Sequence, residues 1–214
     1  MSTPRRALPF YWDRHTEGDG KWRRTGTDGG APPGADLAKL RRGLGRTPGD
    51  VPEMWRFHVT MNQDGVLTRW FVAEHHALTL FGLHQQSQAR PMHRTGVGLG
   101  TAVRALRDKD ATPARAEDGA KTSPKWDRVD PVDRRLSAAA TAGSRHELIL
   151  HLRGLITRLR DLGQGLDYNS LCQDLARWED PEAVAAIRRR WGMQYFVDRT
   201  NNMPSTAATS QENK

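Results

Sequence analysis

The chain has 214 residues, a formal net charge of +8, and 27 arginines among its 33 basic residues. Its length allows one domain or two small ones, and its single cysteine, Cys172, excludes an internal disulfide and fits a reducing cytoplasm. No stretch approaches the length of a membrane span, and Arg5 and Arg6 precede no apolar run that would form a signal peptide. Guanidinium groups bind phosphate bidentately, so the charge favours a nucleic-acid partner, although a GC-rich genome would also favour arginine over lysine.

The first part of the chain contains short helical patterns separated by turn-forming residues. The apolar spacing predicts helices within residues 5–17, 36–44 and 53–60. Residues 19–34 are rich in glycine, threonine, proline and charge and predict an exposed loop, and residues 48–52 predict a turn. The apolar residues expected in these helices are Leu8, Phe10, Tyr11, Trp12, Leu37, Leu40, Leu44, Trp55 and Val59.

The most apolar segment, residues 67–84, predicts the central helix of the first half. His75 and His76 are expected to lie off its apolar face. The glycine-rich residues 96–100 then open a further helix. The buried face of the central helix is expected to contain Trp70, Ala73, Ala77, Leu78 and Phe81.

The composition changes after this half of the chain. Residues 109–130 are rich in proline, alanine, lysine and aspartate without an apolar period, which predicts a linker or mobile loop. Residues 200–214 form a polar tail that we expect to be disordered. No strand-period run of useful length is present. We therefore predict an all-α protein, with two small helical bundles at residues 1–108 and 131–199 joined by the loop.

The clearest helix lies between Ser144 and Gly163. Ser144 and Glu147 have the spacing of a capping box, and Gly163 is a typical helix stop. Arg153 and Arg160 are seven residues apart, so they share one edge of the apolar stripe. That stripe consists of Leu148, Leu152, Leu155, Ile156, Leu159 and Leu162.

Three aspartates predict the starts of the neighbouring helices. Asp133 is expected to cap an alanine-rich helix that opens with Arg134 and Arg135. Asp167 is expected to cap the next helix, and Asp180 followed by proline a last one. The residues expected to be buried in these two helices are Leu171, Cys172, Leu175, Trp178, Val184, Ile187, Trp191, Tyr195 and Phe196.

The residue spacing predicts neither a catalytic nor a metal site. His146 and His151 are five residues apart, so the imidazoles point about 140° apart on a helix and miss the zincin spacing. Residues 96–100 resemble a dinucleotide-binding loop only superficially, because no strand precedes them. Cys172 lacks a nearby histidine, and no paired carboxylates suggest acid–base chemistry. We expect no enzyme, no cofactor and no metal.

The glycine turn before Asp167 also raises the possibility of a helix-turn-helix reader. The following helix contains Asp167, Asp174 and Glu179 against a single basic residue, Arg177, so phosphates would repel it. A stand-alone dimeric DNA-binding regulator nevertheless stays open as an alternative. A second is a structural adaptor whose arginines meet acidic proteins. The arginines could equally be solvated, with some bridging acidic residues of the chain.

An ordered set of these features resembles the CasB family, the small subunits of the type I-E CRISPR surveillance complex Cascade. The resemblance spans roughly residues 9–197. It follows the order Leu40-Arg41-Arg42, Met54-Trp55-Arg56, Gly98-Leu99-Gly100, Asp133-Arg134-Arg135, His151-Leu152-Arg153, Leu166-Asp167-Tyr168, Trp178 and Trp191-Gly192. Where family members have a second arginine after Arg153, this chain has Gly154.

The resemblance implies a non-catalytic, cytoplasmic scaffold subunit. Two copies would lie between the backbone-forming subunits and the large subunit. They would hold the guide RNA–target DNA hybrid and the displaced DNA strand through sugar–phosphate contacts. The family places basic residues at positions that correspond here to Arg41, Arg42, Arg134, Arg135, Arg145 and Arg153. Together with the helical rim, the predicted nucleic-acid-binding residues are Arg41, Arg42, Arg134, Arg135, Arg145, Arg153, Arg160, Arg188 and Arg189.

Overall fold

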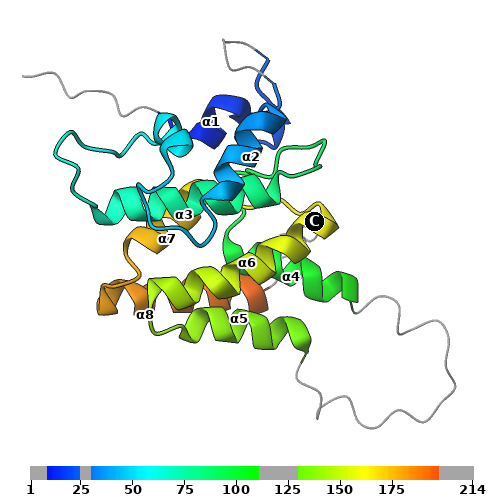
Figure 1. Cartoon of the computed structure of the whole chain (residues 1–214). Coiled ribbons are helices and arrows are strands. Elements are labelled where there is room, and N and C mark those ends of the chain that lie inside the picture. The colour runs from blue at the N-terminus through cyan, green and yellow to red at the C-terminus, as the bar shows by residue number, and fades with distance from the viewer. Residues whose placement is uncertain (1–8, 25–29, 111–129, 198–214) are drawn as a thin grey trace, which may run out of the picture.

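The computed structural model describes residues 9–24, 30–110 and 130–197, and these are mainly helical (Figure 1). The predicted all-α class is confirmed, with one small addition: residues 16–22 form a two-stranded antiparallel hairpin. The elements are α1 (Tyr11–His15), β1 (Thr16–Glu17), β2 (Lys21–Trp22), α2 (Gly34–Arg42), the 3₁₀-helix η1 (Pro52–Phe57), α3 (Arg69–His84), α4 (Leu99–Asp110), α5 (Pro131–Thr141), α6 (Arg145–Leu162), α7 (Tyr168–Ala176) and α8 (Pro181–Phe196). The strands are two residues long, too short to give an alternating pattern in the sequence.

Helices from both parts of the chain share one apolar core. α3 packs against α2 on one side and against α6 and α7 on the other, while α4 packs against α5, α6 and α8. Figure 1 shows α6 between α3 and α5. The division into bundles at 1–108 and 131–199 stays a prediction. α4 runs to Asp110 and Asp130 caps α5, so the rest of the predicted linker, like the predicted tail, lies outside the described residues.

The start and end of α6 confirm the predicted caps. The Ser144 hydroxyl accepts a hydrogen bond from the Glu147 N–H at 3.2 Å, and the Glu147 carboxylate accepts one from the Gly143 N–H at 2.8 Å. Gly163 ends the helix with a φ of 69°, a left-handed conformation in which glycine carries no Cβ penalty. Asp167 and Asp180 cap α7 and α8 as predicted.

The predicted cap of α5 is wrong by one turn. Asp130, not Asp133, accepts from the backbone N–H of Val132, because Pro131 takes the first helical position. Asp133 instead accepts a hydrogen bond from the Tyr195 hydroxyl of α8. Its carboxylate therefore links two helices rather than ending one.

Several burial predictions are also wrong. Trp70, near the start of α3, is partly exposed. Trp55 is also partly exposed, and η1 buries Met54 and Phe57 instead, because the tighter winding of a 3₁₀-helix changes which side chains face the core. Phe196 is exposed at the end of α8. His75 is buried, since α3 is covered on more than one side.

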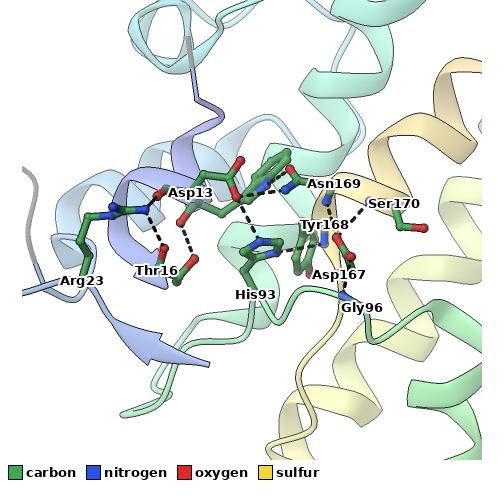
Figure 2. Close-up of polar contacts among 10 residues, drawn as sticks. Asp13, Thr16, Arg23, His93, Gly96, Asp167, Tyr168, Asn169 and Ser170 are labelled. Carbon is green, nitrogen blue, oxygen red and sulfur yellow. Dashed lines mark hydrogen bonds and ion pairs between the residues drawn. The ribbon is translucent and has the colours of Figure 1, made fainter. Parts of the chain in front are cut away.

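A partly buried polar cluster joins α1 to the start of α7 (Figure 2). Trp12 Nε1 donates to Asn169 Oδ1 at 2.7 Å, and Asn169 Nδ2 donates to Asp13 Oδ1 at 3.0 Å. The Tyr168 N–H donates to His93 Nδ1 at 3.1 Å, which leaves the proton of a neutral imidazole on Nε2, 3.1 Å from Asp13 Oδ1. The cluster thus joins segments 75 and 157 residues apart into one unit.

Candidate nucleic-acid interface

An open basic surface lies where α5 packs along α6. A shallow groove of about 360 Å³ separates the exposed sides of the two helices. Arg134 and Arg135 are both exposed, and Arg135 Nη1 donates to the Pro131 carbonyl at 3.1 Å, which leaves other donors of its guanidinium available. The groove is lined by Pro131, Arg134, Arg135, Ala138, Leu150, His151 and Gly154. This lining contains no carboxylate, so it favours an anion.

On the α6 side of this groove, Gly154 has no side chain that would fill the space. A Cβ built on Gly154 would meet no heavy atom within 4 Å. The position therefore has room for a longer side chain, and the glycine leaves a gap beside Arg134 and Arg135 in the groove. Arg153, the preceding residue, is exposed. Leu150 and His151 also line the groove, and neither was predicted as a site residue. The position of Leu150, an exposed apolar residue outside the stripe, was the signal in the sequence that could have indicated it.

Arg145 has a different environment from the groove arginines. It is buried, its Nε donates to the Leu175 carbonyl at 2.9 Å, and its Nη2 lies 3.0 Å from Glu179 Oε2. These contacts tie the start of α6 to the end of α7. The guanidinium is therefore occupied within the fold.

The arginines of α2 and α8 are also engaged to differing degrees. Arg42 pairs with Glu53 at 2.8 Å, and Arg41 Nη1 donates to the Gly82 carbonyl at 3.4 Å. Arg188 Nη2 donates to the Ala142 carbonyl at 3.3 Å. Each retains donors that could reach a phosphate, but each also has an acceptor on another part of the fold.

Arg160 and Arg189 complete the predicted set. Arg160 pairs with the neighbouring Asp161 at 2.9 Å, and Arg189 is exposed on α8, in a second groove beside α4. α2 and α5 lie at opposite sides of the molecule, with α3 and α6 between them (Figure 1). The nine arginines thus form separate basic areas, and the structure places Arg134 and Arg135 together in one groove.

His58, His76 and His84 contribute no positive charge to these surfaces at neutral pH. Burial lowers the pKa of His84 and of His76 to about 3, and that of His58 to about 4. Burial also raises the pKa of the Cys172 thiol, which keeps it protonated and unreactive. Within the described ranges, no three His, Cys, Asp or Glu side chains are grouped so that they could hold a metal ion.

Comparison with known proteins bears on this arrangement. The sequence model of the family described as CRISPR-associated protein Cse2 matches residues 36–196. The chain belongs to this family. The predicted resemblance to CasB is therefore confirmed, and it supports a Cascade-type subunit. No curated protein sequence matches the chain.

Solved structures of the Cse2 family have the same fold. CasB from Thermobifida fusca is 28% identical, with a TM-score of 0.56 over 77% of this chain and 85% of that one. A Cse2-family protein from Thermus thermophilus is 22% identical, with a TM-score of 0.54 over 76% and 85%. CasB from M. ruber is 17% identical, with a TM-score of 0.51 over 76% of this chain and 83% of that one.

None of the helices described for this Cse2-family chain is both long and apolar enough to cross a membrane.

Proposed function

We propose that this chain is a non-catalytic subunit of a type I-E Cascade complex that stabilises the opened DNA target. It acts in the cytoplasm beside the backbone-forming subunits, the large subunit and a second copy of itself. Its arginines contact the sugar–phosphate backbones of the guide-paired target strand and of the displaced strand. The observation that carries the proposal is the α5–α6 groove, where exposed Arg134 and Arg135 stand beside a lining without carboxylates.

Such contacts need not read sequence. Exchanging a DNA duplex for an RNA–DNA hybrid is nearly balanced in free energy, so a few backbone contacts can decide whether the opened state persists. Guanidinium groups suit this task because they bind phosphate in a bidentate geometry. The groove lies between two helices rather than on a helix shaped for a DNA groove, which supports backbone contact over base reading.

A double charge reversal tests the groove. Arg134→Glu with Arg135→Glu is expected to leave assembly with guide RNA intact but weaken the opened target complex. A plot of the logarithm of the DNA-binding constant against the logarithm of salt concentration has a negative slope. Each lost phosphate contact should make this slope shallower by about 0.9, so the double variant should make it shallower by about 1.8. The measurements are permanganate footprinting of the displaced strand and DNA affinity over a range of salt, in complexes containing the variant subunit.

A matched control carries the same change in net charge elsewhere. Arg90 and Arg94 are exposed in the segment before α4 and do not line the α5–α6 groove, so Arg90→Glu with Arg94→Glu should leave strand opening unchanged. If the two double variants behave alike, the effect comes from overall charge and the groove has no special role. Strand opening that is unchanged in the α5 variant would also contradict the proposal.

A gain of function provides the complementary test. Gly154→Arg adds a guanidinium to the α6 side of the groove, at a position where a Cβ meets no heavy atom within 4 Å. We expect tighter DNA binding and a salt slope steeper by about 0.9. Gly154→Ala separates this effect from the general helix stabilisation of about 0.5–1 kcal/mol that replacing a helical glycine gives. Equal DNA binding by the two variants would refute a phosphate contact here.

The same experiments separate the alternative functions. A stand-alone regulator would bind one sequence in preference to scrambled competitors without other subunits. A structural adaptor would show no dependence on Arg134 or Arg135 in DNA binding, while losing assembly when arginines are reversed.

A further inference from the structure

The last two turns of α8 present apolar side chains to solvent. Met193 is 66% exposed, Phe196 70% and Val197 50%. Residues 189, 193 and 196 follow the i, i+4 and i+7 spacing, so they share one face of the helix, and Val197 follows directly after the last helical residue. The opposite face buries Ile187, Trp191 and Tyr195 in the core. α8 therefore has a second face, apolar toward its end, that the described part of the fold does not cover.

This face borders a groove between α4 and α8. The two helices approach closely at Gly98 and Gly100: a Cβ on Gly100 would overlap the carbonyl oxygen of Trp191, and one on Gly98 would overlap the Gln194 side chain. The groove beside this contact has a volume of about 680 Å³. Its walls include Thr101 and Arg104 of α4 and Ala186, Arg189, Met193 and Val197.

The charge in the groove has one sign. Arg104, Arg189 and Arg190 line it, and no aspartate or glutamate does. Arg190 is paired with Asp174, and Arg104 Nη1 donates to the Val197 carbonyl at 2.8 Å. Arg189 is exposed and makes no hydrogen bond or ion pair with another of the described residues. The groove thus offers an available guanidinium next to an apolar strip.

We infer that the α4–α8 groove docks an acidic, apolar segment of another protein. Exposed Met and Phe beside Arg is the composition of protein interfaces, where arginine and large apolar residues carry most of the binding energy. A carboxylate of the partner would meet Arg189, and its apolar side chains would cover Met193, Phe196 and Val197. Nucleic acid fits less well, because two of the three lining guanidiniums already have acceptors and the exposed area beside them is mostly apolar.

The test uses the full chain and a synthetic probe. The probe is a fluorescein-labelled 18-residue helical peptide with leucines along one face and glutamates beside them. Two matched peptides replace either glutamate by lysine or leucine by serine. Fluorescence anisotropy should show binding of the acidic apolar peptide and at least tenfold weaker binding of both controls. On the protein, Arg189→Glu and Met193→Ser with Phe196→Ser should each weaken binding at least tenfold.

Each outcome bears on the inference. These side chains are exposed, so the variants should fold, and equal thermal melts of variant and parent check this. Equal affinity for the acidic and lysine peptides, or full binding by Arg189→Glu, would overturn the docking site. If a thymidine 18-mer displaces the peptide from the parent protein, and binding of the 18-mer is lost in Arg189→Glu, the groove would be reassigned to nucleic acid. Self-association that the Met193→Ser and Phe196→Ser variant loses would reassign it to a second copy. Because Arg134 and Arg135 are unchanged throughout, failure here leaves the proposed DNA contacts untouched.

Discussion

Acidification should destabilise this protein through its buried histidines, and His84 gives the sharpest case. His84 is fully buried on α3. Its Nδ1 lies 3.0 Å from the Tyr168 hydroxyl, which itself donates to the Leu80 carbonyl at 3.2 Å, so Nδ1–H donates to the hydroxyl. Burial lowers the pKa of His84 to about 3, whereas an unfolded chain titrates near 6.5. The unfolded state therefore takes up a proton between these values that the native state excludes.

The sign and size of the effect follow from proton linkage. The contribution of His84 to stability is present above pH 6.5 and falls as the pH drops below it, by about 1.4 kcal/mol per pH unit. Between pH 7 and pH 5 the loss is about 2 kcal/mol for this one residue. His58 and His76, whose pKa values burial also lowers, act in the same direction. Glu74 and Asp174 act in the opposite direction, because burial raises the pKa of each carboxyl.

Comparing a variant with its parent isolates His84 from these other groups. We expect His84→Gln to lose about 2 kcal/mol less than the parent protein between pH 7 and pH 5 in urea unfolding. His146→Gln, on the exposed surface of α6, is the control and should follow the parent. Equal pH dependence of His84→Gln and the parent would refute the argument. If His84→Gln does not fold, the imidazole signals of the parent decide: those of His84 should not titrate down to pH 5.

Two further predictions concern the core and the helix contacts. Gly100→Ala should destabilise the protein by more than about 2 kcal/mol, because its Cβ would overlap the Trp191 carbonyl oxygen. Gly192→Ala, whose Cβ meets nothing within 4 Å, should instead stabilise α8 by about 0.5–1 kcal/mol. Thermal melts distinguish the two signs. Cys172 should react with a disulfide reagent only at the rate of unfolding, because burial raises the pKa of its thiol, and fast labelling of the native protein would contradict that account.

The parts of the fold that depend on local chemistry could be predicted from the sequence. The caps at Ser144, Asp167 and Asp180 and the stop at Gly163 follow from hydrogen bonds and backbone angles within a few residues. Even there, the predicted N-cap of α5 was Asp133, whereas Asp130 is the N-cap in the structure because Pro131 takes the first helical position. Local rules gave the helix correctly and its first turn wrongly.

The parts that depend on the partners of a side chain could not be predicted. The spacing of Arg145 gave no sign that its guanidinium would be buried against Leu175 and Glu179. His75 could not be placed without knowing that other helices cover α3 on more than one side. The exposed pair Arg134 and Arg135 was predicted, but the groove beside it depends on how α5 lies on α6.

The cluster that joins α1 to α7 has a consequence for synthesis on the ribosome. Trp12 and its acceptor Asn169 are 157 residues apart. At about 5–20 residues per second, roughly 8–30 s pass between their translation. During that time Trp12 can reach Phe81 but lacks Tyr168 and Asn169, so part of its surface stays exposed in the nascent chain, where chaperones bind it or it promotes aggregation. A ribosome stalled before α7 should therefore hold an α1 segment that proteases cleave readily, and α1 should become resistant only once α7 has emerged.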